Sequence, residues 1–228
     1  MSENAVPSSV GFILDGNRRW AKENGLPQLE GHRRGMEKVK DILRWARAAG
    51  VKEVCVYAFS TENWNRSPEE VSYLMNLFEE FCDRWADELK NEGGRLRFVG
   101  ERARFSETLQ SKMEQAEAET KDGTGPTLIV ALSYGGRAEI VAGVNRLLQE
   151  GATQVTEASF EKSLWSAGME DPDIIIRTGG EHRLSNFMMW RSAYSELFFT
   201  DTKLPAFTKE EFDAILAEYA TRDRRRGR

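Results

Sequence analysis

The stretch DIIIRTGGEHRLSN, residues 173–186, joins a short apolar run to a polar loop that contains two glycines. Three consecutive isoleucines at positions 174–176 are typical of a short strand buried on both faces of a parallel sheet. The loop then supplies the guanidiniums of Arg177 and Arg183 and the hydroxyl of Ser185, and arginine binds phosphate oxygens with a planar fork. Since open α/β sheets bind ligands at the carboxyl ends of their strands, the stretch predicts a phosphate site. The alternative is an ordinary charged surface loop.

Strand and helix patterns alternate along the rest of the chain. Strands are expected at 10–14, 53–59, 95–99, 127–132, 173–176 and around 197–199, and helices at 32–49, 67–91, 106–120, 137–150 and from 208 onward. The helix from Ser67 has the clearest start, with a serine cap, a proline at the first helical position and Glu70 three residues after the cap. The alternation predicts a single α/β domain over residues 1–228, with a mainly parallel sheet covered on both faces by helices. Residues 1–9 are expected to be flexible, and residues 222–228 read as a basic tail.

Composition limits the class of protein. The chain has 228 residues, 40% of them hydrophobic, and a formal net charge of -5, which argues against nucleic acid as the main partner. Cys55 and Cys82 lie in apolar patterns and are expected to be buried free thiols in a reducing compartment. The sequence shows no signal-peptide pattern and no apolar run near the roughly 18 residues that span a bilayer, so a cytoplasmic protein is expected.

A second candidate anion site follows the first expected strand. Residues 15–20, DGNRRW, place a carboxylate, a glycine and two arginines where a helical segment begins. Helix N-termini bind phosphate, and Asp15 could hold a magnesium ion that bridges to phosphate oxygens; an Asx helix cap with solvated arginines is the equal alternative. His32 could add a hydrogen bond to the same phosphate, although a structural histidine is the commoner case. The loop 60–66 belongs on the same sheet edge and is either a substrate-positioning loop or a polar turn.

The helix expected at 67–91 carries a wide apolar stripe, whose members recur at spacings near three and four. Core packing is the default interpretation of this stripe, and the wall of an apolar ligand channel would use the same residues. No glycine signature of a nucleotide-binding loop accompanies the polar loops. The residues alone therefore predict a magnesium-dependent enzyme or binder of phosphorylated ligands, with room for two phosphates, and they do not specify a reaction.

Over nearly its whole length the chain resembles the cis-prenyltransferase family, of the undecaprenyl diphosphate synthase type. The motifs that carry the resemblance occur in order: DGNRRW at 15–20, GH at 31–32, YAFSTENWNR at 57–66, YGGR at 134–137, the loop 177–186 and YSELFF at 194–199. The resemblance implies a homodimer with a central, mostly parallel six-stranded sheet and a hydrophobic tunnel. It also implies magnesium-dependent condensation of isopentenyl diphosphate with an allylic diphosphate primer such as farnesyl diphosphate. The product would be a Z-polyprenyl diphosphate, through which the protein would contact a membrane peripherally.

By position, the resemblance implies a role for each motif residue. The catalytic residues would be Asp15, Ser60 and Asn63, the last two helping diphosphate departure or proton removal. The magnesium ligands would be Asp15, Glu196 and His182. The allylic diphosphate would be bound by Asn17, Arg18, Arg19, His32 and Arg66, and the isopentenyl diphosphate by Arg177, Arg183 and Ser185. Gly16 and Trp20 would also bind substrate. The tail residues Arg225–Gly227 would reach into the partner subunit's site.

Three positions depart from the family pattern. Many relatives have glycine where this chain has Arg18, a basic residue where it has Gln28, and phenylalanine where it has Arg226. The missing charge at Gln28 weakens the expected clamp on the allylic diphosphate, and Arg18 either compensates or favours a different primer. Two alternatives share the fold: a short-chain or head-to-middle prenyl diphosphate synthase, which the complete loop 177–186 disfavours in its head-to-middle form, and a non-catalytic partner subunit. Presence of the expected site residues disfavours the non-catalytic subunit, whereas product length and primer do not follow from these motifs.

Overall fold

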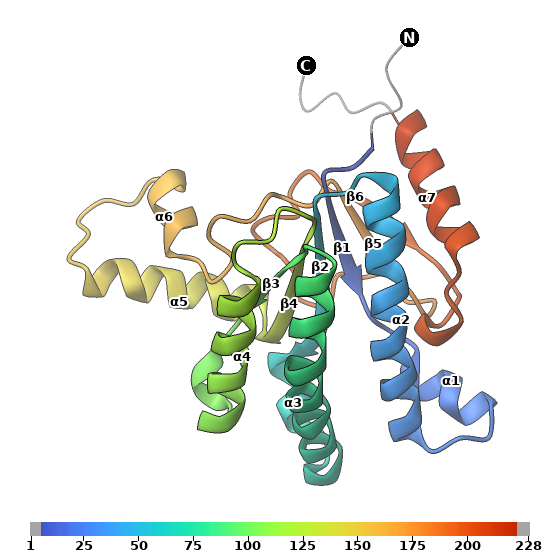
Figure 1. Ribbon diagram of the computed structural model, residues 1–228. Helices are drawn as coiled ribbons and strands as arrows, with labels where there is room; N and C mark the ends of the chain where they lie inside the picture. Colours follow the sequence, from blue (N-terminus) through green and yellow to red (C-terminus); the bar gives the residue numbers. More distant parts are fainter. Residues whose placement is uncertain (1–5, 223–228) are drawn as a thin grey trace.

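Six parallel strands form one sheet in the computed structural model, which describes residues 6–222 (Figure 1). The strand order is β3-β4-β2-β1-β5-β6, and every described strand pair is parallel. The strands are β1 Ser9–Ile13, β2 Glu53–Ser60, β3 Arg95–Val99, β4 Thr127–Tyr134, β5 Ile174–Arg177 and β6 Glu196–Phe199. The predicted six-stranded parallel sheet is therefore confirmed. Ser9, at the end of the stretch expected to be flexible, is a buried residue of β1.

Seven α-helices lie within the described residues: α1 Asn17–Glu23, α2 Gln28–Ala49, α3 Pro68–Asn91, α4 Glu107–Thr120, α5 Gly136–Gln149, α6 Glu157–Ser163 and α7 Lys209–Thr221. As predicted, Ser67 caps α3, and its Oγ accepts the backbone N–H of Glu70 at 3.3 Å. The short α6 and the 3-10 helix Thr61–Asn65 were not predicted from the sequence. Across residues 6–222, no helix combines the length and the hydropathy needed to cross a bilayer.

Helices cover one face of the sheet, and α2, α3 and α4 lie side by side in front of it in Figure 1. Alternate strand residues such as Phe12 and Val130 pack into a large core with α2, α3, α4 and α7. On the other face, Tyr57 stacks on Phe187 at 4.8 Å between ring centroids, and Met188 packs nearby. An irregular segment between β5 and β6 packs on this second face through Leu184, Phe187 and Met188. Five residues of that segment have positive φ, two of them glycines, which excludes a continuous helix.

The strand register brings the predicted polar loops to one edge. Ile13 of β1 lies opposite both Tyr57 of β2 and Arg177 of β5, so the loops that follow these three strands leave the sheet together. Gly16 makes the turn from β1 into α1 with φ +99°, and a Cβ there would lie 2.8 Å from Cβ of Lys203. A side chain is thus excluded from the turn by both strain and space.

Candidate active site

A cavity of about 610 Å³ opens at this carboxyl edge. The predicted site residues that line it are Asp15, Asn17, His32, Ser60, Asn63, Arg66, Arg177, Arg183 and Ser185. Its wall continues into apolar side chains that include Leu74, Leu77 and Phe78 of α3. The cavity therefore joins a polar end, rich in arginine, to a hydrocarbon end.

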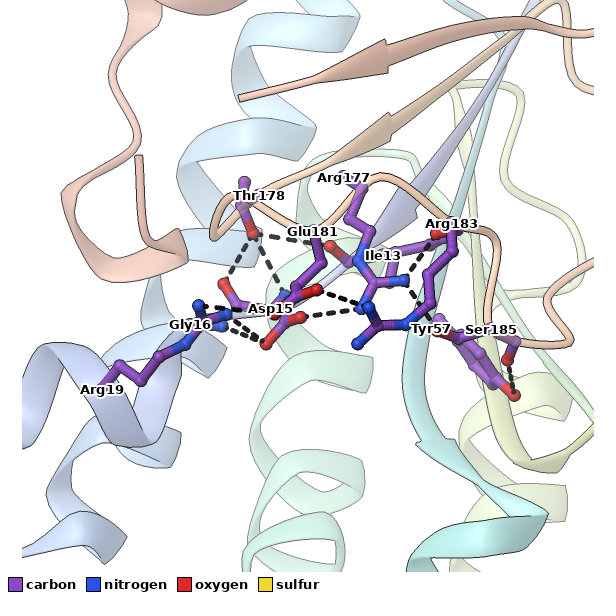
Figure 2. Close-up of polar contacts among 10 residues, drawn as sticks. All are labelled: Ile13, Asp15, Gly16, Arg19, Tyr57, Arg177, Thr178, Glu181, Arg183 and Ser185. Atoms are coloured by element: carbon purple, nitrogen blue, oxygen red, sulfur yellow. Dashed lines mark hydrogen bonds and ion pairs between the residues drawn. The ribbon is translucent and has the colours of Figure 1, made fainter. Parts of the chain in front are cut away.

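Asp15 is the carboxylate at the centre of the polar end (Figure 2). Its Oδ2 accepts a hydrogen bond from Arg177 Nη2 at 2.9 Å, and its Oδ1 accepts one from Arg19 Nη2 at 3.2 Å. Thr178 Oγ1 also donates to the Asp15 carbonyl at 2.7 Å, which ties the two loops together. Burial acts to raise the pKa of Asp15, but bonds from Arg177 and the Gly16 N–H, with the nearby guanidinium charges, outweigh it and hold the pKa below its ordinary value. Asp15 is thus an ionised carboxylate on the cavity wall.

Arg177 shapes the phosphate loop as well as facing the cavity. Its side chain is only 5% exposed, and Nη1 donates to Ser185 Oγ at 2.7 Å and to the carbonyl of Arg183. Arg183 is far more accessible, since its side chain is 60% exposed and pairs with Glu181 at the surface. One arginine of the loop is fixed in place before any ligand binds, and the other can turn toward a ligand.

Across the cavity, a second carboxylate holds the other cations. Glu70 Oε1 accepts from Arg66 Nη1 at 2.9 Å and lies 3.2 Å from His32 Nε2, and Glu70 Oε2 lies 3.4 Å from Arg18 Nη1. Glu70 is outside the cavity lining, whereas Arg66 and His32 are part of it. Burial and the charge of Arg66 lower the pKa of His32, while Glu70 acts in the opposite sense. This end presents the Arg66 guanidinium and the His32 imidazole to the cavity, with the Glu70 carboxylate behind them.

Ser60 and Asn63 are held together on the cavity wall. They cap the 3-10 helix reciprocally, with the Ser60 N–H donating to Asn63 Oδ1 at 3.1 Å. Because the amide oxygen of Asn63 is engaged in this way, its NH₂ is the part that can act on a ligand, and it can only donate.

Within one chain, the three expected magnesium ligands do not come together. Glu196 opens β6 opposite Ile174, at the amino edge of the sheet, and pairs with Arg222 at 2.7 Å. His182 stacks on Phe199 at 4.9 Å between ring centroids. Residues 6–222 contain no group of three or more His, Cys, Asp or Glu side chains placed to hold a metal ion. Of the three, Asp15 alone is among the residues that line the cavity.

Several other expected site residues are not among those that line the cavity. Arg18 and Arg19 reach Glu70 and Asp15, Gly16 forms the turn, and Trp20 is absent from the described lining. The predicted role of Arg225–Gly227 falls outside the described residues. Both cysteines are buried and free, as predicted.

Sequence reasoning missed three functional candidates. Asn186 Nδ2 donates to Glu62 at 2.9 Å, both residues line the cavity, and Asn186 Oδ1 accepts the backbone N–H of Arg137. The third is Glu70. Its spacing of four residues from Arg66 was a signal for an ion pair, although Arg66 lies in the loop before α3.

The cavity has basic residues in two groups, the ionised carboxylate of Asp15 and an apolar wall. It fits ligands that combine phosphate groups with a hydrocarbon chain.

The chain belongs to the family described as putative undecaprenyl diphosphate synthase, whose model matches residues 13–227. It is 41% identical to an isoprenyl transferase of Neisseria gonorrhoeae, over 100% of this chain and 92% of the relative. It is 45% identical to an isoprenyl transferase of Listeria monocytogenes, over 97% of this chain and 90% of the relative. The protein is thus a cis-prenyltransferase.

Two solved structures share the fold. Lavandulyl diphosphate synthase from Lavandula x intermedia, in complex with dimethylallyl diphosphate, gives a TM-score of 0.93 at 33% identity and covers 99% of this chain and 100% of its own. A probable undecaprenyl diphosphate synthase from Campylobacter jejuni gives a TM-score of 0.84 at 27% identity, with 100% of both chains covered.

Proposed function

We propose that this protein condenses isopentenyl diphosphate with an allylic diphosphate primer such as farnesyl diphosphate, in a magnesium-dependent reaction that releases diphosphate and gives a Z-polyprenyl diphosphate. The observation that carries the proposal is the single cavity that joins two cation clusters to an apolar wall. Two diphosphates can bind side by side there, each on its own cations, with the primer's hydrocarbon chain along α3.

The chemistry needs stabilised negative charge on the leaving group. The allylic C–O bond breaks with its electron pair leaving on the diphosphate, and the double bond of isopentenyl diphosphate supplies the pair for the new C–C bond. A proton is then lost. Arg66 and His32 bind the leaving diphosphate. The NH₂ group of Asn63, which can only donate, favours departure of the diphosphate, and it does not accept the proton. Arg177, Arg183 and Ser185 orient the isopentenyl diphosphate.

Asp15 would hold the magnesium ion, which is commonly bound in proteins through only one or two carboxylates. The carboxylate is ionised, lies on the cavity wall and is 30% exposed. When bound, magnesium would neutralise charge on the diphosphate as the bond breaks. His182 and Glu196 would join it only through a rearrangement or a contribution across the homodimer that the family resemblance implies.

The homodimer itself has support from α5. Val141, Val144 and Leu148 are exposed at spacings of three and four residues, so they form an apolar stripe on one face of the helix. A second copy of this chain would cover that stripe.

The apolar end of the cavity would become the wall of the expected tunnel. Burying a growing prenyl chain there would contribute roughly 0.8 kcal/mol per CH₂. Met36, Leu77 and Phe78 are among the apolar residues that line the cavity, so they would contact the growing chain.

A second candidate function is head-to-middle coupling of two allylic units, favoured by the close structural likeness to lavandulyl diphosphate synthase. Product analysis separates the two. The purified protein is incubated with magnesium, labelled isopentenyl diphosphate and primers of increasing length, and the products are sized. We expect label in a product lengthened by whole isoprene units. Product from dimethylallyl diphosphate alone, with no label incorporated, would contradict the proposal.

A further inference from the structure

Glu70 lies behind the allylic end of the cavity and binds three basic side chains from three segments. Arg18 comes from α1, His32 from α2, and Arg66 from the loop before α3. The Glu70 side chain is 13% exposed and is not part of the cavity lining, so it does not meet a ligand directly.

The position of Glu70 in its helix does not require this arrangement. A glutamate three residues after a serine cap usually turns back to the backbone N–H of the cap residue. Here Ser67 Oγ accepts the Glu70 N–H, but the Glu70 carboxylate points instead to the cations. The neighbouring Glu69 is exposed in the same first turn and provides the negative charge that favours a helix N-terminus. The Glu70 carboxylate therefore takes no part in capping the helix.

We propose that Glu70 is a positioning residue, which holds the Arg66 and His32 side chains on the cavity wall in the arrangement that binds the allylic diphosphate. The inference rests on the proposed function, since it takes the ligand of this end to be the primer. A long arginine side chain that is already ordered loses less conformational freedom when the diphosphate binds. The carboxylate also offsets the repulsion among the basic groups that it brings together.

The test compares Glu70→Ala and Glu70→Gln with Glu69→Gln, a matched control that removes a carboxylate from the same helical turn without touching the cluster. Wild-type turnover is measured first with both substrates. We expect Glu70→Ala to raise the KM for the primer about tenfold, the lower end of effects for residues that orient binding groups. The KM for isopentenyl diphosphate should change much less, Glu70→Gln should be intermediate because its amide oxygen still accepts from Arg66, and Glu69→Gln should match the wild type.

Two results would overturn the positioning role. A lower KM for the primer in Glu70→Gln would show that the carboxylate competes with the diphosphate rather than placing its ligands. Equal increases in both KM values, together with a lower melting temperature than Glu69→Gln, would show a purely structural role.

The affinity for inorganic diphosphate tests the positioning role without requiring any catalytic turnover. Calorimetry is done in an Arg183→Ala background, which weakens binding at the isopentenyl diphosphate end, so the measured affinity is mainly that of the end near Glu70. In this background, adding Glu70→Ala should weaken diphosphate binding about tenfold relative to adding Glu69→Gln. A chain that binds diphosphate in this way but makes no prenyl product would overturn the proposed function and support the positioning role. Equal affinities in the two variants would overturn the positioning role alone.

Discussion

Asp15 and Glu70 both bind arginines, but they lie on different sides of them. Asp15 faces the cavity, whereas Glu70 lies behind the basic residues that face it. Asp15 is 30% exposed and lies on the cavity wall beside Arg177, which is almost fully buried. Glu70 is 13% exposed and lies behind the wall, while Arg66 and His32 form the surface that a ligand meets. A ligand in the cavity therefore meets the carboxylate of one ion pair, Asp15, and the basic residues of the other, Arg66 and His32.

Because one carboxylate faces the cavity and the other does not, the two ion-pair clusters are suited to different roles. The primer's diphosphate can bind directly to Arg66 and His32, whereas the Asp15 carboxylate would repel it unless a cation lay between them. Asp15 is thus suited to metal-assisted chemistry and the Glu70 cluster to anchoring. Variants that remove one charge at each end should have different kinetic signatures.

The largest effect is expected for Asp15→Asn, which removes the charge with little change in volume. Turnover with saturating magnesium and both substrates should fall about 10³-fold, since charge stabilisation on the leaving group is lost. The fold should persist, because Arg177 keeps its bonds to Ser185 and the Arg183 carbonyl. Circular dichroism checks the fold, and turnover within about tenfold of the wild type would contradict the metal assignment.

A smaller, crossed effect is expected for Arg183→Ala and Arg66→Ala. Each loses a charged hydrogen bond worth about 1.5–3 kcal/mol, so each should raise the KM of its own substrate about 10- to 100-fold. Arg183→Ala should act on isopentenyl diphosphate and Arg66→Ala on the primer. Initial rates over a grid of both substrates measure the two values in each variant. Equal effects on both substrates in either variant would show that the two ends are wrongly assigned.

Much of the fold follows from local sequence signals. Ser67 and Pro68 mark the start of α3 because a hydroxyl cap and a proline at the first helical position act within a few residues. The cover of the second sheet face could not be predicted in this way. Phe187 is buried through its contact with Tyr57, 130 positions earlier in the sequence, and no local period records that contact.

The same limit applies to the site. Asp15 and Arg177 could be predicted because each lies at the carboxyl end of a strand, where a parallel sheet gathers its loops. The role of Glu70 could not, since its partners Arg18 and His32 are 52 and 38 positions away, and the local pattern matches a helix cap. Glu196 was assigned from motif order, yet its strand begins at the opposite edge of the sheet from Asp15.

The smallest expected effect is a change in the titration of His32. Burial and Arg66 hold its pKa below the ordinary value of 6.5, and Glu70 opposes them, so Glu70→Gln should lower the pKa of His32 further. The chain has two histidines, and the NMR signal absent from His32→Gln identifies the one that matters. Following this signal from pH 8 downward should show its midpoint at lower pH in Glu70→Gln than in Glu69→Gln or the wild type.

The sign of the linked stability follows from the same shift. A histidine whose pKa is lower in the folded than in the unfolded chain leaves stability intact above the unfolded pKa, near 6.5, and reduces it as the pH falls below that value. Because the shift is larger without Glu70, the melting temperature of Glu70→Gln should fall more steeply below pH 6.5 than that of Glu69→Gln. The same pH dependence of the melting temperature in both variants would show that Glu70 does not interact with the His32 imidazole. A His32 midpoint that rises in Glu70→Gln would show the same, and Glu70 would then bind arginines alone, as Asp15 does.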